Sequence, residues 1–72
     1  MEDKSIALKL AVRIRNLRRE YNYTQQKLSE MANIDYKHIQ LLESKKPPYA
    51  KLDTLEKLAK AFKIKLSKLL EF

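Results

Sequence analysis

The residues best suited to bind a ligand are four polar side chains close together in the sequence: Tyr36, Lys37, His38 and Gln40. Lysine can donate to O6 or N7 of guanine, and glutamine can pair with adenine. Tyr36 offers a hydroxyl group and a ring that can touch a phosphate or a thymine methyl, and His38 lies on the flank of the same segment. This set predicts contacts with the base edges of a nucleic acid. The alternative is a solvated helix face of similar composition.

A second candidate site is cationic and directly follows the first. Residues 44–51 hold three lysines and no acidic residue, whereas residues 21–43 hold two lysines against three acidic residues, a net charge of −1. Lys45 and Lys46 are therefore expected to hold a phosphate backbone beside the base-reading residues. The whole chain has a formal net charge of +7, which favours an anionic partner.

The composition excludes several other kinds of site. The 72 residues include no glycine, so the glycine-rich loops that cradle nucleotide phosphates are ruled out. With no cysteine and one histidine, the chain cannot build a thiolate or zinc-cluster site. Its carboxylates are scattered and no nucleophile has an obvious base, so we expect no enzymatic activity, no metal and no cofactor. The apolar runs are too short to span a bilayer, and we expect a cytoplasmic protein.

Helices must position these residues, because helical periodicity dominates the sequence. Over about 5–20, apolar residues recur at spacings of four, four, three and four, which predicts one buried stripe made of Ile6, Leu10, Ile14, Leu17 and Tyr21. Asn22 is expected to end this helix in a left-handed conformation. Lys9 and Arg13 face elsewhere, and either bind phosphates or form a solvated face.

Two short helices with a tight turn between them follow. Thr24 is a good N-cap for a helix over 25–32, and Asn33 suits a left-handed turn. Asp35 then caps a helix that runs to about 43 or 44. Two capped helices joined in this way form a helix-turn-helix.

The rest of the chain is also predicted to be helical. In the second helix of the pair, Ile39 and Leu42 are expected to face the core, so they cannot read bases. After a loop over 44–50, a fourth helix carries Leu52, Leu55, Leu58, Ala59 and Phe62 on one face. A short fifth helix over about 66–71 carries Leu66, Leu69 and Leu70, with Phe72 after it. We therefore expect a single all-α domain with five helices.

Three stretches carry a resemblance to a known family. They are L-A-V-R-I-R-N-L-R-R-E in the first helix, T-Q-Q-K-L-S-E-M-A-N-I-D-Y-K-H-I-Q-L-L-E-S over 24–44, and the leucine-rich segment from 52 to 70. Together they resemble the lambda-repressor-like, Cro-type family over nearly the whole chain. The resemblance implies a helix-turn-helix over about 24–43 that binds double-stranded DNA. It also implies that Thr24 and Gln25 contact phosphate, and that Arg18 and Glu43 form a structural ion pair.

At three positions where the family usually has glycine, this sequence has another residue. Asn33 stands in the turn of the helix-turn-helix, Lys45 stands two residues after Glu43, and Lys63 stands at the end of the fourth helix. Asparagine tolerates a positive φ, whereas lysine adopts it at a cost in free energy.

The resemblance implies a transcription regulator that binds an inverted-repeat operator as a homodimer. A controller protein of a restriction–modification system and a small phage-type repressor are both consistent with it. The alternative is an antitoxin-like protein that binds a toxin partner and regulates its own operon. We expect the dimer interface at Leu69, Leu70 and Phe72, although Leu69 could instead lie in the core. A membrane surface and RNA fit less well, because the apolar residues fill a core and a rigid helix reads the DNA major groove better than that of RNA.

Overall fold

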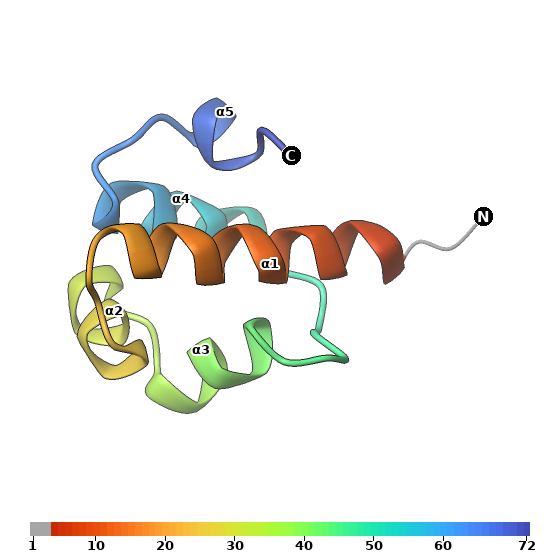
Figure 1. The fold of residues 1–72 in the computed structure, drawn as a ribbon, viewed down its shortest axis with the longest axis horizontal. Helices are drawn as coiled ribbons and strands as arrows, with labels where there is room; N and C mark the ends of the chain where they lie inside the picture. The colour runs from red at the N-terminus through yellow and green to blue at the C-terminus, as the bar shows by residue number, and fades with distance from the viewer. Residues whose placement is uncertain (1–3) are drawn as a thin grey trace.

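The computed structural model describes residues 4–72. Its helices are α1 (Lys4–Glu20), α2 (Gln25–Ala32), α3 (Tyr36–Leu42), α4 (Leu52–Ala61) and α5 (Leu66–Leu69), and residues 4–72 contain no strand. The predicted all-α architecture with five helices is confirmed. In Figure 1, α1 crosses the middle of the view, with α2 and α3 below it and α5 above it.

Side-chain caps start both helices of the helix-turn-helix as the sequence predicts. The Thr24 hydroxyl accepts a hydrogen bond from the Lys27 amide at 3.0 Å, and the Asp35 carboxylate accepts one from the Lys37 amide at 3.1 Å. Each bond satisfies a backbone N–H that the first turn of a helix leaves without a partner. The start of α3, and with it the placement of Tyr36, is therefore fixed by local chemistry.

Three residues with left-handed backbones end the longer helices without glycine: Asn22 (φ 59°), Asn33 (φ 55°) and Lys63 (φ 57°). Each helix end closes with the same pair of hydrogen bonds. After α4, for example, the Ile64 amide donates to the Ala59 carbonyl and the Lys63 amide to the Lys60 carbonyl, both at 3.0 Å. This is the Schellman arrangement, which calls for a positive φ. Lys45 is not among the described residues with a positive φ, so the cost expected there is absent.

The core forms around leucines and isoleucines from every helix, but its helical stripes differ from the predicted ones. Ile6 is 59% exposed, because α1 turns Ala7, Leu10 and Ala11 inward instead. Leu52 is 75% exposed, since it occupies the first position of α4, ahead of the buried residues of that helix. Both residues were expected in the core, and both expectations are wrong.

Tyr21 also departs from the predicted stripe, since it lies at the edge of the core. Its ring meets the ring of the fully buried Phe62 edge-on, with the centroids 5.2 Å apart. Its hydroxyl donates to the Phe62 carbonyl. This contact joins the end of α1 to the end of α4.

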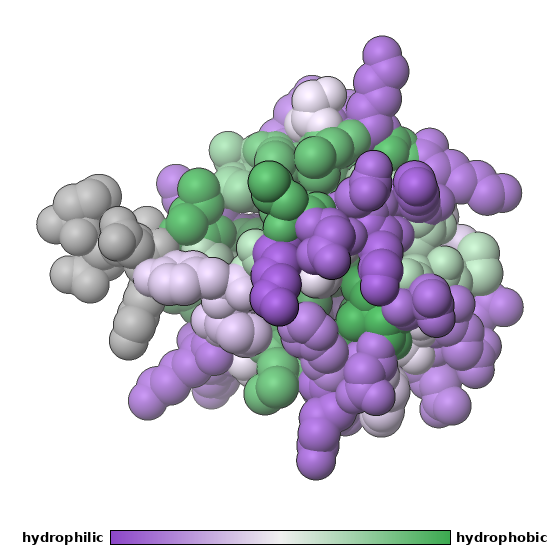
Figure 2. Space-filling model, turned by 180° about the vertical axis from the view of Figure 1, so that it is seen from behind, coloured by the Kyte–Doolittle hydropathy of each residue, from purple (hydrophilic) through white to green (hydrophobic). Residues whose placement is uncertain are grey.

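The C-terminal segment, residues 66–72, has some of its apolar side chains in the core and others on the surface. Leu69 is fully buried, so it has no surface to offer a second subunit, which corrects the expectation that it lies at a dimer interface. Leu70 and Phe72 remain 39% and 49% exposed. Seen from behind, apolar side chains gather around α5 and the C-terminal end (Figure 2).

Arg13 connects α1 to this C-terminal segment. Its guanidinium donates to the backbone carbonyls of Lys68 at 2.8 Å and Leu69 at 3.2 Å. These carbonyls belong to the last turn of α5, which ends at Leu69 and is shorter than the predicted 66–71. A helix of four residues cannot persist alone in water. The contact therefore gives Arg13 a structural role that neither alternative from the sequence foresaw.

Candidate nucleic-acid interface

α3 packs its apolar side against the core and leaves the opposite side exposed. Ile39 and Leu42 have 0% and 1% of their surface exposed and hold the helix against the core. Lys37 and Gln40 are exposed on the opposite side, and Tyr36 is 43% exposed at the first position of the helix. Three of the four predicted base-reading residues thus lie on one accessible surface.

His38 and Leu41 differ from the other residues of α3. His38 is only half-buried, between the accessible surface and the core, so it offers less of its ring to a ligand. Leu41 is 51% exposed and lies one helical turn after Lys37. Leu41 was not predicted from the sequence, although a helical wheel that puts Ile39 and Leu42 in the core would have turned it outward. We call Tyr36, Lys37, Gln40 and Leu41 the outward face of α3.

An ion pair fixes the end of α3 to α1. Arg18 Nε lies 2.8 Å from Glu43 Oε2, and Arg18 Nη2 donates to Glu43 Oε1 at 3.0 Å. The guanidinium also donates to the Tyr23 carbonyl at 3.0 Å. Only 3% of the Glu43 side chain and 16% of the Arg18 side chain are exposed. Neither charge is available to DNA, so the pair orients α3.

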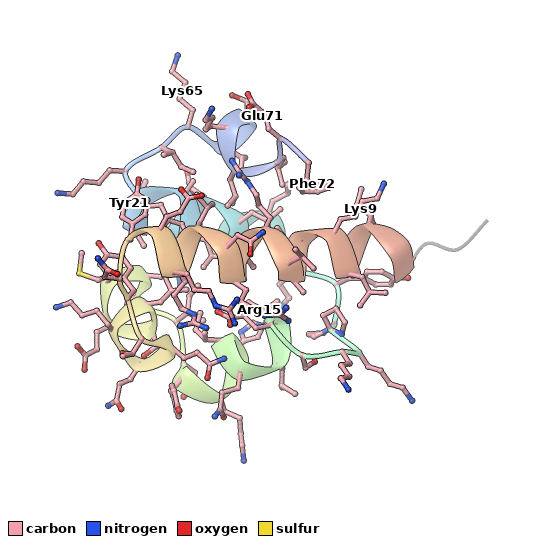
Figure 3. All side chains as sticks on the ribbon, viewed as in Figure 1. Lys9, Arg15, Tyr21, Lys65, Glu71 and Phe72 are labelled. Carbon is pink, nitrogen blue, oxygen red and sulfur yellow. The ribbon has the colours of Figure 1, made fainter. Side chains whose placement is uncertain are left out.

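Two further side chains converge on Glu43. Gln25 Nε2 donates to Glu43 Oε1 at 3.2 Å, and Arg15 Nη2 donates to the Glu43 backbone carbonyl at 2.7 Å. Figure 3 shows Arg15 reaching from α1 toward α3. Glu43 therefore connects α1, α2 and α3. Neither contact was predicted: the resemblance assigned only Arg18 to Glu43, and helical periodicity does not reveal contacts over 28 and 18 residues.

The residues expected to contact phosphate lie at two places beside α3. Thr24 and Gln25 are at the N-terminus of α2, where backbone N–H groups point outward and favour an anion. The Thr24 hydroxyl is used in the cap, and the Gln25 amide is used in its bond to Glu43. Lys45 and Lys46 are exposed in the segment that follows α3.

Two other kinds of site find no support in the described residues. No group of three or more His, Cys, Asp or Glu side chains among them could hold a metal ion. None of the helices within residues 4–72 has the length and apolar character needed to cross a membrane.

Comparison with known proteins identifies the family. The family model of the Cro/C1-type HTH DNA-binding domain matches residues 13–72, which include the whole helix-turn-helix, the ion pair and the C-terminal segment. No curated protein and no solved structure matches the chain. The match covers well over half of the sequence and agrees with the all-helical fold and with the outward face of α3. The chain therefore belongs to the family of Cro/C1-type HTH DNA-binding domains, which act in transcription regulation.

Proposed function

We propose that this protein is a transcription regulator that binds an inverted-repeat operator sequence-specifically as a homodimer. The outward face of α3 carries this proposal, because it presents Tyr36, Lys37 and Gln40 opposite the buried side of the helix. The second helix of a helix-turn-helix enters the major groove and reads bases from its N-terminal end. Lys37 donates to guanine, and Gln40 pairs with adenine. His38 contributes from the flank.

The phosphate contacts come from both sides of α3. Thr24 and Gln25 approach one strand through the N-terminus of α2, where Gln25 keeps a second amide N–H beyond the one given to Glu43. Lys45 and Lys46 approach the backbone beside the groove as point charges on flexible stems. Such contacts fix the orientation of the protein on the duplex, while the base contacts supply the sequence preference.

The homodimer forms through the exposed apolar side chains of the C-terminal segment. Leu70 and Phe72 border an apolar groove that is also lined by Ile6, Tyr49 and Leu55. A two-fold axis at this groove brings the same surface of each subunit together, as in an isologous interface. The two copies of α3 then read half-sites about 34–36 Å apart.

The regulated genes belong to a restriction–modification or phage-type operon, and the protein acts in the cytoplasm without enzymatic activity. The antitoxin-like alternative is favoured by a second groove that Phe72 also lines. This groove is lined by Leu8, Val12 and Arg13, and it would give a protein partner additional apolar surface.

Selection of binding sites from random duplexes tests the proposal directly. We expect enrichment of an inverted repeat whose half-site centres lie one helical turn apart. Enrichment of a single half-site would contradict the homodimer, and no enrichment would contradict sequence-specific binding. Co-purification of a stoichiometric second protein would support the antitoxin-like alternative.

Replacing Lys37 with alanine should relax the base preference at one position of each half-site. A good bidentate base contact is worth about 1–3 kcal/mol of discrimination, and this amount should disappear from the comparison of matched and mismatched operators. Competition binding measures the effect, with Lys27→Ala as the control, since Lys27 is an exposed lysine on α2. Equal decreases in affinity for operator and scrambled duplex would mean that Lys37 contacts only phosphate.

Replacing Lys45 and Lys46 together with alanine should weaken binding to all duplexes alike. The slope of log K against log salt should flatten by about one unit for each phosphate that the variant no longer binds, because fewer counterions are released. The control is the double variant Lys57→Ala, Lys60→Ala, which removes the same charge from the exposed side of α4. If both double variants show the wild-type slope, Lys45 and Lys46 do not hold the backbone.

A further inference from the structure

Leu41 is an apolar side chain on a surface that otherwise offers hydrogen bonds. It is 51% exposed, with Gln40 beside it and Lys37 one turn earlier in the helix. Ser44, three residues after Leu41, is already engaged, because its hydroxyl donates to the Leu41 carbonyl at 2.7 Å. Leu41 therefore presents apolar surface between polar groups at the place where DNA is proposed to lie.

The two residues that follow Leu41 are buried and anchor this end of α3. Leu42 is 1% exposed and Glu43 is 5% exposed, and Glu43 is held by Arg18 and by Arg15. The two apolar grooves at the C-terminal end include no residue of α3. Leu41 therefore lies outside the surface assigned to the homodimer. It lies on the surface proposed to face DNA, so DNA is its expected partner.

We infer that Leu41 contacts the C5-methyl group of a pyrimidine in the major groove, and that this pyrimidine is thymine. The inference rests on the proposed function and adds a base preference to it. A leucine side chain has no donor or acceptor, so it cannot read the polar edge of a base. The C5-methyl group of thymine is the apolar group that unmodified base pairs present in the major groove. Contact between the two removes apolar surface from water on both sides.

Uracil substitution tests this contact one methyl group at a time. Each thymine of the selected operator is replaced singly by deoxyuridine, and dissociation constants are measured for the wild type and for Leu41→Ala. At one position of each half-site, the affinity of the wild type should fall about fourfold, the factor that corresponds to about 0.8 kcal/mol for one buried carbon group. Leu41→Ala should bind the thymine and uracil operators equally at that position.

Leu52→Ala is the matched control, because Leu52 is an exposed leucine on α4. It should keep the wild-type response to uracil. Both variants should keep the wild-type helix content by circular dichroism, since alanine favours the helix at least as well as leucine.

Several results would overturn the inference. The first is a wild type whose affinity does not change with any uracil substitution. The second is a uracil effect of equal size in the wild type and in Leu41→Ala. The third is a selected operator that has no thymine in reach of α3. A parallel series replaces cytosine with 5-methylcytosine, which carries the same methyl group. A Leu41-dependent gain in that series alone would assign the contact to methylated cytosine and overturn thymine. If selection enriches no sequence at all, the proposed function fails too, whereas specific binding without a uracil effect removes only the role of Leu41.

Discussion

Replacing Arg18 with alanine is expected to lower the free energy of unfolding by about 3–5 kcal/mol, the usual cost of removing one partner of a buried ion pair. The variant leaves Glu43 with 3% of its side chain exposed and without its bidentate partner. The free energy of unfolding of a small domain is only about 5–15 kcal/mol, so the variant would lose a large part of it. Urea unfolding followed by circular dichroism measures the change.

Arg19→Ala is the control for this experiment, since Arg19 is an exposed arginine on the same helix. Its effect on stability should stay within about 0.5 kcal/mol. An Arg18→Ala protein that unfolds like the wild type but no longer binds DNA would contradict the structural role and would make Arg18 a DNA contact.

The double variant Leu70→Glu, Phe72→Glu should be monomeric, and its operator affinity should fall by about 10²–10⁴-fold, because two linked half-sites bind much more tightly than one when the second contact becomes intramolecular. Both side chains are partly exposed, so the charges should break the interface while the core around Leu69 stays intact. Sedimentation measures the oligomeric state, and circular dichroism checks that the helices remain.

The neutral variant Leu70→Gln, Phe72→Gln separates the removal of apolar surface from the repulsion of DNA by added negative charge. It should also be monomeric and show most of the same decrease in affinity. If the Glu variant remains a dimer, the interface lies elsewhere, and the exposed side of α4 becomes the alternative.

The starts of α2 and α3 and the ends of α1 and α2 could be predicted well from the sequence because they depend on neighbouring residues, whereas the end of α5 was placed too late. Thr24 and Asp35 cap their helices with bonds that reach two or three residues along the chain. Asn22 and Asn33 adopt the left-handed backbone that asparagine tolerates better than most residues. Such features need no knowledge of tertiary packing.

Burial was harder to predict, because it depends on how each helix is rotated against the others. Ile6 and Leu52 are apolar and belong to the predicted buried stripes, yet the packing leaves both exposed. For Leu69 the sequence left both the core and the interface open, and the structure places it in the core, whereas the adjacent Leu70 is exposed. The contacts of Arg13 and Arg15 were equally out of reach, since Arg13 binds carbonyls 55 and 56 residues away and Arg15 binds one 28 residues away. The Arg18–Glu43 pair, in contrast, was expected from the family resemblance alone.

The base-reading, phosphate-binding and interface residues remain predictions. Exposure on α3 agrees with a reading role for Tyr36, Lys37 and Gln40, and the half-buried His38 fits it less well. Exposure alone does not identify the base that each residue prefers, because that depends on the geometry of the DNA as well as of the protein.

The arginines of α1 link the two proposed contact surfaces of the molecule. Arg13 holds the carbonyls at the end of α5, and two residues later Arg15 holds the end of α3 on nearly the opposite side of the same helix. The end of α3 and the end of α5 are thus both fastened to one short stretch of α1 rather than joined by a flexible linker. In the proposed dimer, one extra base pair at the centre of the operator would rotate one half-site by about 34–36°. A rigid pair of subunits would then engage only one half-site, and in that dimer α1 would set the length of the operator that the protein accepts.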